Sequence, residues 1–267
     1  MRVLLAGDWH GNREWAASCF SAAAGCGADV MLQLGDFGLW PGREDEWLDH
    51  VDVLAGASGV PFVWIDGNHE NHAALRRWRA VGPAGDGLVP MRRHVSWAPR
   101  GTRWAWAGVR FGALGGAVSI DRFLRRPGVN WWSEEVPTQA DVDRLGDDRL
   151  DVLVSHAAPS TGHVPPARLV AALERLPADI VADLRAVRDL LDQAVDRTRP
   201  RLVVHGHYHV RRSGSAGETH VEGLAHDKSS PAEALAVLDL DGADGGLVVR
   251  PVPGGEGQEA SRSRTVS

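Results

Sequence analysis

Five short segments of the chain carry aspartate, histidine or asparagine next to a small residue. They are Gly7-Asp8-Trp9-His10, Gly35-Asp36, Gly67-Asn68-His69-Glu70, Ser155-His156 and Gly206-His207-Tyr208-His209. A mixture of carboxylate, amide and imidazole donors binds divalent cations, and suits Mn, Fe or Zn better than Ca or Mg. A carboxylate such as Asp36 can offer one oxygen to each of two ions. The segments therefore contain the donors for a pair of metal ions.

Each of these segments follows a short apolar run that is typical of a buried strand. The runs are 3–5, 30–32, 62–65, 152–154 and 202–204. Because ligands in open α/β sheets bind at the carboxyl ends of the strands, we expect the polar segments to converge there. Each segment alone has an ordinary explanation as a helix cap, a turn or a surface histidine. Their joint occurrence in one chain favours a metal site.

The elements that would position these segments alternate along the first 80 residues. We expect strands at 2–7, 29–34 and 61–65, and helices at about 12–25, 43–56 and 71–79. Strands that alternate with helices of this length predict βαβ units and a largely parallel sheet. The sequence thus predicts the α/β class for this half of the chain.

The second half has a more varied pattern. Residues 104–116 predict two short strands around a glycine turn, and 118–137 predict a long ordered loop near the site because they contain Trp131 and Trp132. Further predicted elements are a strand at 151–154, a helix at 178–196, a strand at 201–204, and closing strands at 218–225, 234–240 and 246–252. The tail 253–267 is poor in apolar residues, so we expect it to be disordered.

Composition places the chain among ordinary soluble globular proteins, with 43% hydrophobic and 24% charged residues. No run approaches the roughly 18 apolar residues of a membrane span, and a strand begins directly after Met1, so we expect a cytoplasmic protein. Between Asn71 and Arg126 stand eleven arginines and two acidic residues. A basic segment beside an acidic cleft suits an anionic substrate, although solvated arginines would give the same composition.

In order and spacing, the five segments resemble the motifs of the calcineurin-like metallophosphoesterases. The resemblance covers Asp-x-His, Gly-Asp, Gly-Asn-His-Glu, a later His and Gly-His-x-His, over roughly residues 3–210. It implies a four-layer α/β/β/α sandwich of two mixed β-sheets flanked by helices, formed by a domain at 1–252. It also implies two ions, one held by Asp8, His10, Asp36 and His209, the other by Asp36, Asn68, His156 and His207.

Two departures bear on the type of phosphoesterase. Serine/threonine phosphatases of this family carry Gly-Asp-x-Val-Asp-Arg-Gly around the bridging aspartate. Here Asp36 is followed by Phe37 and Gly38, and the Asp-Arg pair is missing. The Gly-Asn-His-Glu motif is followed by Asn71 instead of arginine. Both differences disfavour a dedicated phosphoprotein phosphatase.

The resemblance also implies a mechanism, in which a hydroxide bridging the ions attacks phosphorus in line. Asp36 is catalytic as the shared ligand, and His69, assigned to no ion, is the candidate general acid. Glu70 is expected in the first turn of the next helix. The candidate substrate-binding residues are Asn68, Arg122, Arg125 and Arg126. The three arginines could bind phosphate bidentately or be solvated loop charges.

We therefore expect a dinuclear metal-dependent phosphoric ester hydrolase, a phosphatase or phosphodiesterase acting on a small phosphorylated substrate such as a nucleotide or cyclic nucleotide. The alternatives are a nuclease, a phosphoprotein phosphatase and a non-catalytic scaffold. A nucleic-acid substrate is not favoured, because no segment is evidently suited to grip a duplex. Scaffolds of this fold typically lose ligands, which are all present here. The remaining histidines His72, His163 and His226 are expected at the surface, although His163, in the loop after His156, could also line the cleft.

Overall fold

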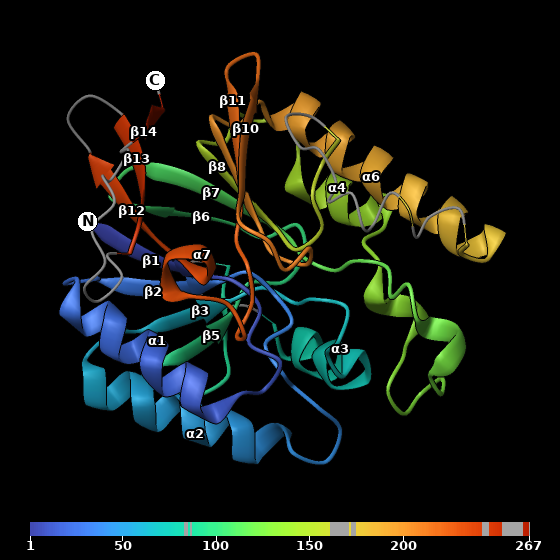
Figure 1. Cartoon of the computed structure of the whole chain (residues 1–267), viewed down its shortest axis with the longest axis horizontal. Coiled ribbons are helices and arrows are strands. Elements are labelled where there is room, and N and C mark those ends of the chain that lie inside the picture. Colours follow the sequence, from blue (N-terminus) through green and yellow to red (C-terminus); the bar gives the residue numbers. More distant parts are fainter. Residues whose placement is uncertain are drawn as a thin grey trace.

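Alternating strands and helices occupy the first third of the chain in the computed structural model (Figure 1), which describes residues 1–82, 85, 87–160, 171, 175–241, 246–252 and 264–266. The order is β1 (Arg2–Ala6), α1 (Arg13–Gly25), β2 (Val30–Gln33), α2 (Glu44–Ser58), β3 (Phe62–Trp64) and α3 (His72–Val81). Two of these helices start at an asparagine cap. The Asn12 side chain accepts from Trp15 N, and the Asn71 side chain accepts from Ala74 N. The predicted alternation is confirmed.

The first sheet has eight strands in the order β14-β13-β12-β1-β2-β3-β5-β4. The added strands are β4 (Val89–Pro90), β5 (Val95–Trp97), β12 (Leu235–Asp241), β13 (Gly246–Pro251) and β14 (Arg264–Val266). Neighbours from β1 through β2 and β3 to β5 are parallel, whereas β12 and β13 pair antiparallel. The sheet is therefore mixed, and its parallel part aligns the carboxyl ends of β1, β2 and β3.

The second sheet has six strands in the order β10-β11-β9-β8-β7-β6. They are β6 (Arg103–Trp106), β7 (Val109–Leu114), β8 (Val152–Ser155), β9 (Leu202–His205), β10 (Arg212–Ala216) and β11 (Thr219–Gly223). The central neighbours β7, β8, β9 and β11 are parallel, and both edge strands are antiparallel. After β7, the α-helices among the described residues are α4 (Gln139–Leu145), α6 (Ala178–Thr198) and the short α7 (Pro231–Ala234).

Three hydrophobic clusters separate four layers. Side chains of a strand alternate between its two faces, so on β1 Leu4 packs toward the helices α1 and α2, while Val3 and Leu5 pack between the sheets. A third cluster lies between the second sheet and the helices α4 and α6, with Leu153 on the sheet side and Leu191 on the helix side. Figure 1 shows the two pairs of helices on the outer faces. The predicted α/β/β/α sandwich is confirmed.

Some elements differ from the sequence prediction. Strands β5 and β10 and helix α4 form in segments for which no element was predicted. The predicted loop 118–137 contains the short 3-10 helices Arg122–Leu124 and Ser133–Glu135. Within the predicted tail, only Arg264–Val266 is described, and it forms a strand that pairs with β13. The expected disorder of the tail stays a prediction. No described helix combines the length and apolar character needed to cross a membrane.

Candidate metal centre

The predicted ligands come together at the carboxyl ends of five strands that belong to both sheets. Asp8 and His10 follow β1, Asp36 follows β2, Asn68 follows β3, His156 follows β8, and His207 and His209 follow β9. These strand ends lie next to one another because β1, β2 and β3 are parallel, as are β8 and β9. Sequence segments up to 200 residues apart therefore meet at one rim.

The first group comprises Asp8, His10, Asp36 and His209, whose potential ligand atoms all lie within 4.8 Å of one another. Nε2 of His209 is 2.9 Å from Oδ2 of Asp8. Nε2 of His10 is 3.5 Å from Oδ2 of Asp36. Two carboxylates and two imidazoles thus enclose one position of the kind that a divalent transition-metal ion occupies.

The second group comprises Asp36, His156 and His207, whose potential ligand atoms also lie within 4.8 Å of one another. Nε2 of His156 is 3.4 Å from Oδ1 of Asp36 and 3.2 Å from Oδ1 of Asn68. The amide nitrogen of Asn68 donates to Ser119 Oγ at 3.0 Å, which leaves its oxygen facing the group. Asp36 is common to both groups, and each of its two oxygens faces one of them.

The burial and charge of these residues fit a pair of cations. Asp8 and Asp36 are 0% and 1% exposed. Within the described part of the chain, neither carboxylate has a lysine or arginine ion-pair partner, and the ion pairs they make are with histidines. Burying two carboxylates without permanent cationic partners is costly, and bound divalent ions would supply the missing charge. The donor set therefore suits the metals that the sequence implied.

The carboxylate of Asp36 also determines the proton affinity of its histidine neighbours. Burial alone would lower the pKa of His10 and His156, but the charge of Asp36 and its hydrogen bonds outweigh burial and raise both to about 9. For His207, burial, reinforced by the charge of His156, outweighs the charges of Asp36 and Asp8 and lowers the pKa to about 3. Because metal ligation requires neutral imidazoles, ion binding at His10 and His156 would displace protons.

Four of the candidate ligands have a left-handed backbone, which costs L-residues other than glycine conformational energy. The φ angles are 47° at His10, 51° at Asp36, 65° at His207 and 55° at His209. The glycine of Gly67-Asn68 is required for a different reason, since a Cβ there would overlap Oδ1 of Asp36. Such strained and crowded backbone is characteristic of a functional site held in place by its surroundings.

A second layer of contacts orients two of the histidines. Nδ1 of His156 donates to the Leu34 carbonyl at 2.7 Å, so its Nε2 faces Asp36. Nδ1 of His10 lies 3.3 Å from Oδ1 of Asp227. This fixing of one ring nitrogen by a carbonyl or carboxylate is typical of metal-ligating histidines. The sequence reasoning missed Asp227, which lies outside all five motifs.

Glu70 has a different role from the predicted one. Helix α3 begins at His72 with Asn71 as its cap, so Glu70 precedes the helix. It is fully buried, and its carboxylate accepts from the backbone N–H groups of Phe37, Gly38 and Leu39. Glu70 therefore anchors the loop that follows Asp36. The motif that contains Glu70 and the motif that contains Asp36 are thereby one connected unit.

His69 lies at the edge of the centre beside a cavity. Its Nε2 is 3.9 Å from Asp36 Oδ2 and 3.4 Å from Arg125 Nη2. Burial is the main reason that the pKa of His69 is lowered, and the charge of Arg125 acts in the same direction. The cavity has a volume of about 370 Å³ and is lined by His10, Trp40, Pro41, His69, Arg125, Asn130 and Trp132.

The other two predicted arginines are not part of this cavity lining. Arg122 pairs with Asp183 at 2.5 Å and Asp179 at 2.6 Å on α6. Arg126 is exposed, and its backbone N–H donates to the Asn130 side chain. Their proposed contact with substrate remains a prediction. Of the three arginines, only Arg125 is placed beside the candidate ligands.

Two of the three histidines expected at the surface are described. His72 is buried at 5% exposure, so that prediction was wrong. His226 is half-buried, with its ring 4.3 Å from the ring of His209. His163 lies outside the described residues. The structure thus puts His226 next to a candidate ligand, a position that its sequence context did not indicate.

The geometry agrees with comparisons to known proteins. The family model for calcineurin-like phosphoesterases matches residues 1–211. The chain belongs to the calcineurin-like phosphoesterase family, which confirms the resemblance seen in the motifs. It is therefore a metallophosphoesterase, an enzyme that hydrolyses phosphoric esters. No curated protein sequence gives a significant match.

Solved structures show the same fold. A dimetal phosphatase from Danio rerio has a TM-score of 0.58 at 14% identity, covering 100% of this chain and 99% of that one. The protein TT1561 of Thermus thermophilus has a TM-score of 0.57 at 14% identity, with 89% and 93% covered. GAP50, described as the anchor in the inner membrane complex of Plasmodium, has a TM-score of 0.56 at 13% identity, with 100% and 89% covered. At these identities the likeness shows the fold alone.

Proposed function

We propose that the chain hydrolyses phosphoric esters of small nucleotide-like molecules, cyclic nucleotides included. One observation carries the choice of substrate, namely that the cavity beside His69 combines the Arg125 guanidinium with Trp40 and Trp132. A guanidinium binds phosphate oxygens bidentately, and a tryptophan face stacks on a nucleobase. A volume of about 370 Å³ is in the range of small-molecule sites.

Two divalent cations, with Mn, Fe or Zn favoured by the mixed donors, complete the proposed centre. The first would be held by Asp8, His10, Asp36 and His209, and the second by Asp36, Asn68, His156 and His207. When bound, such ions neutralise charge on phosphoryl oxygens and bring the pKa of water toward neutrality.

The chain's own residues supply binding and proton transfer. The guanidinium of Arg125 lies at the cavity edge beside His69, where the Asp121 carboxylate accepts from its Nε at 2.7 Å and its Nη2 at 2.8 Å. A phosphoryl oxygen would take the place of Asp121 on this guanidinium. His69 would give its proton to the departing oxygen, a role that fits its place between the cavity and the shared ligand. Trp40, whose side chain is partly exposed at the cavity, would hold the base.

The first test is turnover of p-nitrophenyl phosphate and bis-p-nitrophenyl phosphate with added manganese, with and without chelator. Nucleoside monophosphates, cyclic nucleotides, short DNA and a phosphoserine peptide then form a panel. We expect metal-dependent turnover with the highest kcat/KM for a nucleotide or cyclic nucleotide. Preferred cleavage of DNA or of the phosphopeptide, or no turnover of either simple ester, would contradict the proposal.

A substitution tests the stacking role of tryptophan. Trp40→Ala should lower kcat/KM for the best nucleotide about 10-fold, because stacking of one base contributes roughly 1–3 kcal/mol. It should leave kcat/KM for methyl phosphate, which has no ring, close to the wild-type value. Trp40→Phe keeps an aromatic face and is the matched control, which should retain most of the nucleotide activity. Equal losses for both esters in Trp40→Ala would argue against stacking.

A further inference from the structure

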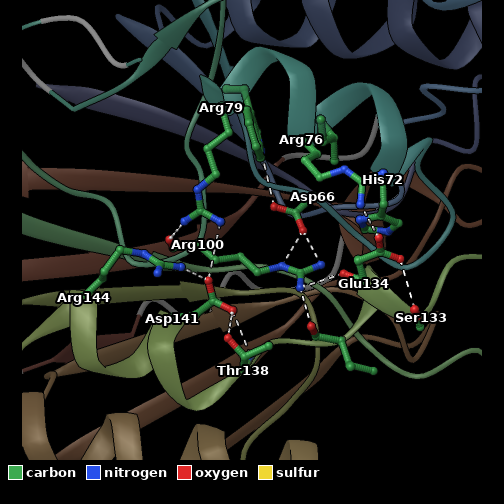
Figure 2. A pocket seen from close by; sticks show the side chains of 13 residues that line it. Asp66, His72, Arg76, Arg79, Arg100, Ser133, Glu134, Thr138, Asp141 and Arg144 are labelled. Atoms are coloured by element: carbon green, nitrogen blue, oxygen red, sulfur yellow. Dashed lines mark hydrogen bonds and ion pairs between the residues drawn. The ribbon is translucent and has the colours of Figure 1, made fainter. Parts of the chain in front are cut away.

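A second cavity, of about 340 Å³, lies between α3 and α4 (Figure 2). Its lining includes residues from both helices, from the segment after β3 and from the segment 133–136, and excludes every candidate metal ligand. This volume is within the range of small-ligand sites. The cavity is therefore large enough for a compound of its own, separate from the substrate of the metal centre.

The inner wall of the cavity is mostly apolar. Leu75 and Trp97 are buried at 3% exposure each, and both line it together with Val136. The buried carboxylate of Asp66 is paired with Arg100 at 2.7 Å, so these two charges satisfy each other. The interior thus offers an apolar surface without an open charge of its own.

The rim of the cavity on the α4 side has more positive than negative charge. Asp141 faces both Arg79, at 3.6 Å, and Arg144 through the same oxygen, Oδ1. Its other oxygen accepts from the backbone and hydroxyl of Thr138 at 2.8 and 2.7 Å. Burial lowers the pKa of Arg79, and the charge of Arg144 acts in the same direction. Two guanidinium groups thus share one carboxylate oxygen at this rim.

The opposite rim holds an exposed ion pair, in which an incoming anion could replace the carboxylate as the partner of the arginine. Arg76 pairs with Glu134 at 2.7 Å, and the two side chains are 69% and 48% exposed. Pairs this exposed contribute little to stability. Figure 2 shows these side chains and those of Arg79 and Arg144 around the same opening.

His72 adds an unused hydrogen-bond acceptor to the lining. It is 5% exposed, its ring is hydrogen-bonded to the backbone of Asn68, and its Nε2 has no partner in the described part of the chain. When Nδ1 holds the proton of the bond to Asn68, Nε2 has a free lone pair. A buried polar atom without a partner is unfavourable, and a hydroxyl or N–H group of a ligand would satisfy it.

We propose that the cavity between α3 and α4 is a second binding site that takes a small organic anion, with its charged group between Arg79 and Arg144 and an apolar body against Leu75 and Trp97. The excess of guanidinium groups selects a phosphonate, phosphate or carboxylate. The apolar wall selects a body such as an aryl ring. This site does not depend on the substrate proposed for the metal centre.

The test uses 4-hydroxyphenylphosphonate, which has a C–P bond and is therefore not a phosphoric ester. Isothermal titration calorimetry of the metal-loaded protein should show two binding events, one at the metal centre and one at the α3–α4 cavity. Arg144→Ala should weaken binding at the α3–α4 cavity at least 10-fold, because a charged hydrogen-bonded pair between probe and protein is lost. Asp36→Asn should remove the binding event at the metal centre and leave the event at the α3–α4 cavity unchanged.

Arg110→Ala is the matched control, because Arg110 also pairs with an aspartate and its side chain is 50% exposed, compared with 47% for Arg144. It should bind the probe as the wild type does. Arg144→Ala should also keep the wild-type turnover of p-nitrophenyl phosphate, which shows that the fold and centre are intact. The proposal is overturned if Arg144→Ala and wild type bind the probe with equal affinity and stoichiometry.

Discussion

Nδ1 of His10 lies 3.3 Å from Oδ1 of Asp227, a residue 217 positions later in the chain. The other oxygen of Asp227 accepts from the Asn12 amide at 2.8 Å, so the carboxylate is fixed in orientation. With Nδ1 bound to this carboxylate, Nε2 of His10 is directed to Asp36, 3.5 Å away. Asp227 therefore sets the ring orientation of a candidate ligand without being in either candidate group.

Asp227→Asn should weaken metal binding at the first group about 10–100-fold, the usual effect of losing a carboxylate behind a ligating histidine. The asparagine keeps the shape of the side chain but loses its charge, so the imidazole becomes a poorer donor. A chelating dye in competition with the protein measures the affinity. At saturating metal, kcat should stay near the wild-type value.

Asp151→Asn is the control for this substitution, because Asp151 pairs with Arg110 at the end of β8 opposite to His156. It should leave metal affinity unchanged. If Asp227→Asn binds metal as tightly as this control does, then Asp227 has no part in holding His10.

His69→Ala should retain both ions and lose most of the activity. His69 is near Asp36, at 3.9 Å, but belongs to neither candidate group, so its removal leaves the donors in place. General acid catalysis contributes typically 10²–10⁴-fold, and this factor should appear in kcat for alkyl or ribose leaving groups. The loss should be much smaller for p-nitrophenyl phosphate, whose leaving group needs no proton.

The decisive measurement for His69 is how the loss of activity on its removal depends on the leaving group. A Brønsted plot of kcat/KM against leaving-group pKa should become steeper in His69→Ala than in wild type. Parallel plots, with equal losses for good and poor leaving groups, would assign His69 to binding or positioning and exclude proton donation.

The fold could be predicted where a local pattern determines the element. Asn12 and Asn71 precede apolar periodicity and cap α1 and α3, and each polar motif follows an apolar strand. Strand β5 is different, because Val95–Trp97 is only three residues long and is stabilised by pairing with β3. Helix α4 has only seven residues, and the capping box formed by Thr138 and Asp141 is the one local sequence signal for its start.

The site residues also divide into those with a local sequence signal and those without one. The motifs identified the ligand donors because each motif combines metal-binding residue types with a position directly after an apolar strand. The contact between His10 and Asp227 depends on how the chain returns from β11 past Asp8, with which His226 forms an isolated bridge. Glu70 was assigned to the helix because acidic residues favour a first turn, yet its bonds to the loop after Asp36 take precedence. Such contacts between distant segments have no local sequence signal.

Asp36→Asn should lose metal as well as rate, because this carboxylate faces both candidate groups. The asparagine removes a buried negative charge that the ions would neutralise, so we expect metal content to fall well below two ions per chain. Elemental analysis of the purified variant measures this directly. A variant that keeps two ions and loses only activity would show that Asp36 is not the shared ligand.

Glu135 holds the hydrogen-bonded chain that positions Asn68. Its carboxyl group accepts from the backbone and hydroxyl of Ser119 at 2.7 Å each, and the Ser119 hydroxyl accepts from Asn68. Burial raises the pKa of Glu135 from 4.5 to about 7, because the hydrogen bonds from Ser119 only partly offset it. The folded protein therefore keeps a proton on this group at pH values where the unfolded chain has released it.

The free energy of unfolding should consequently fall as pH rises from 4.5 to about 7. Below this window Glu135 is protonated in both the folded and the unfolded state and does not change the free energy of unfolding. Above it the group is ionised in both states, and the free energy of unfolding is lower by about 3 kcal/mol. Glu135→Gln cannot titrate, so its stability should change less with pH across the window. Denaturant unfolding of chelator-treated wild type and variant at several pH values measures the difference. Curves of stability against pH that stay parallel across this window would mean that Glu135 is ionised in the folded protein throughout.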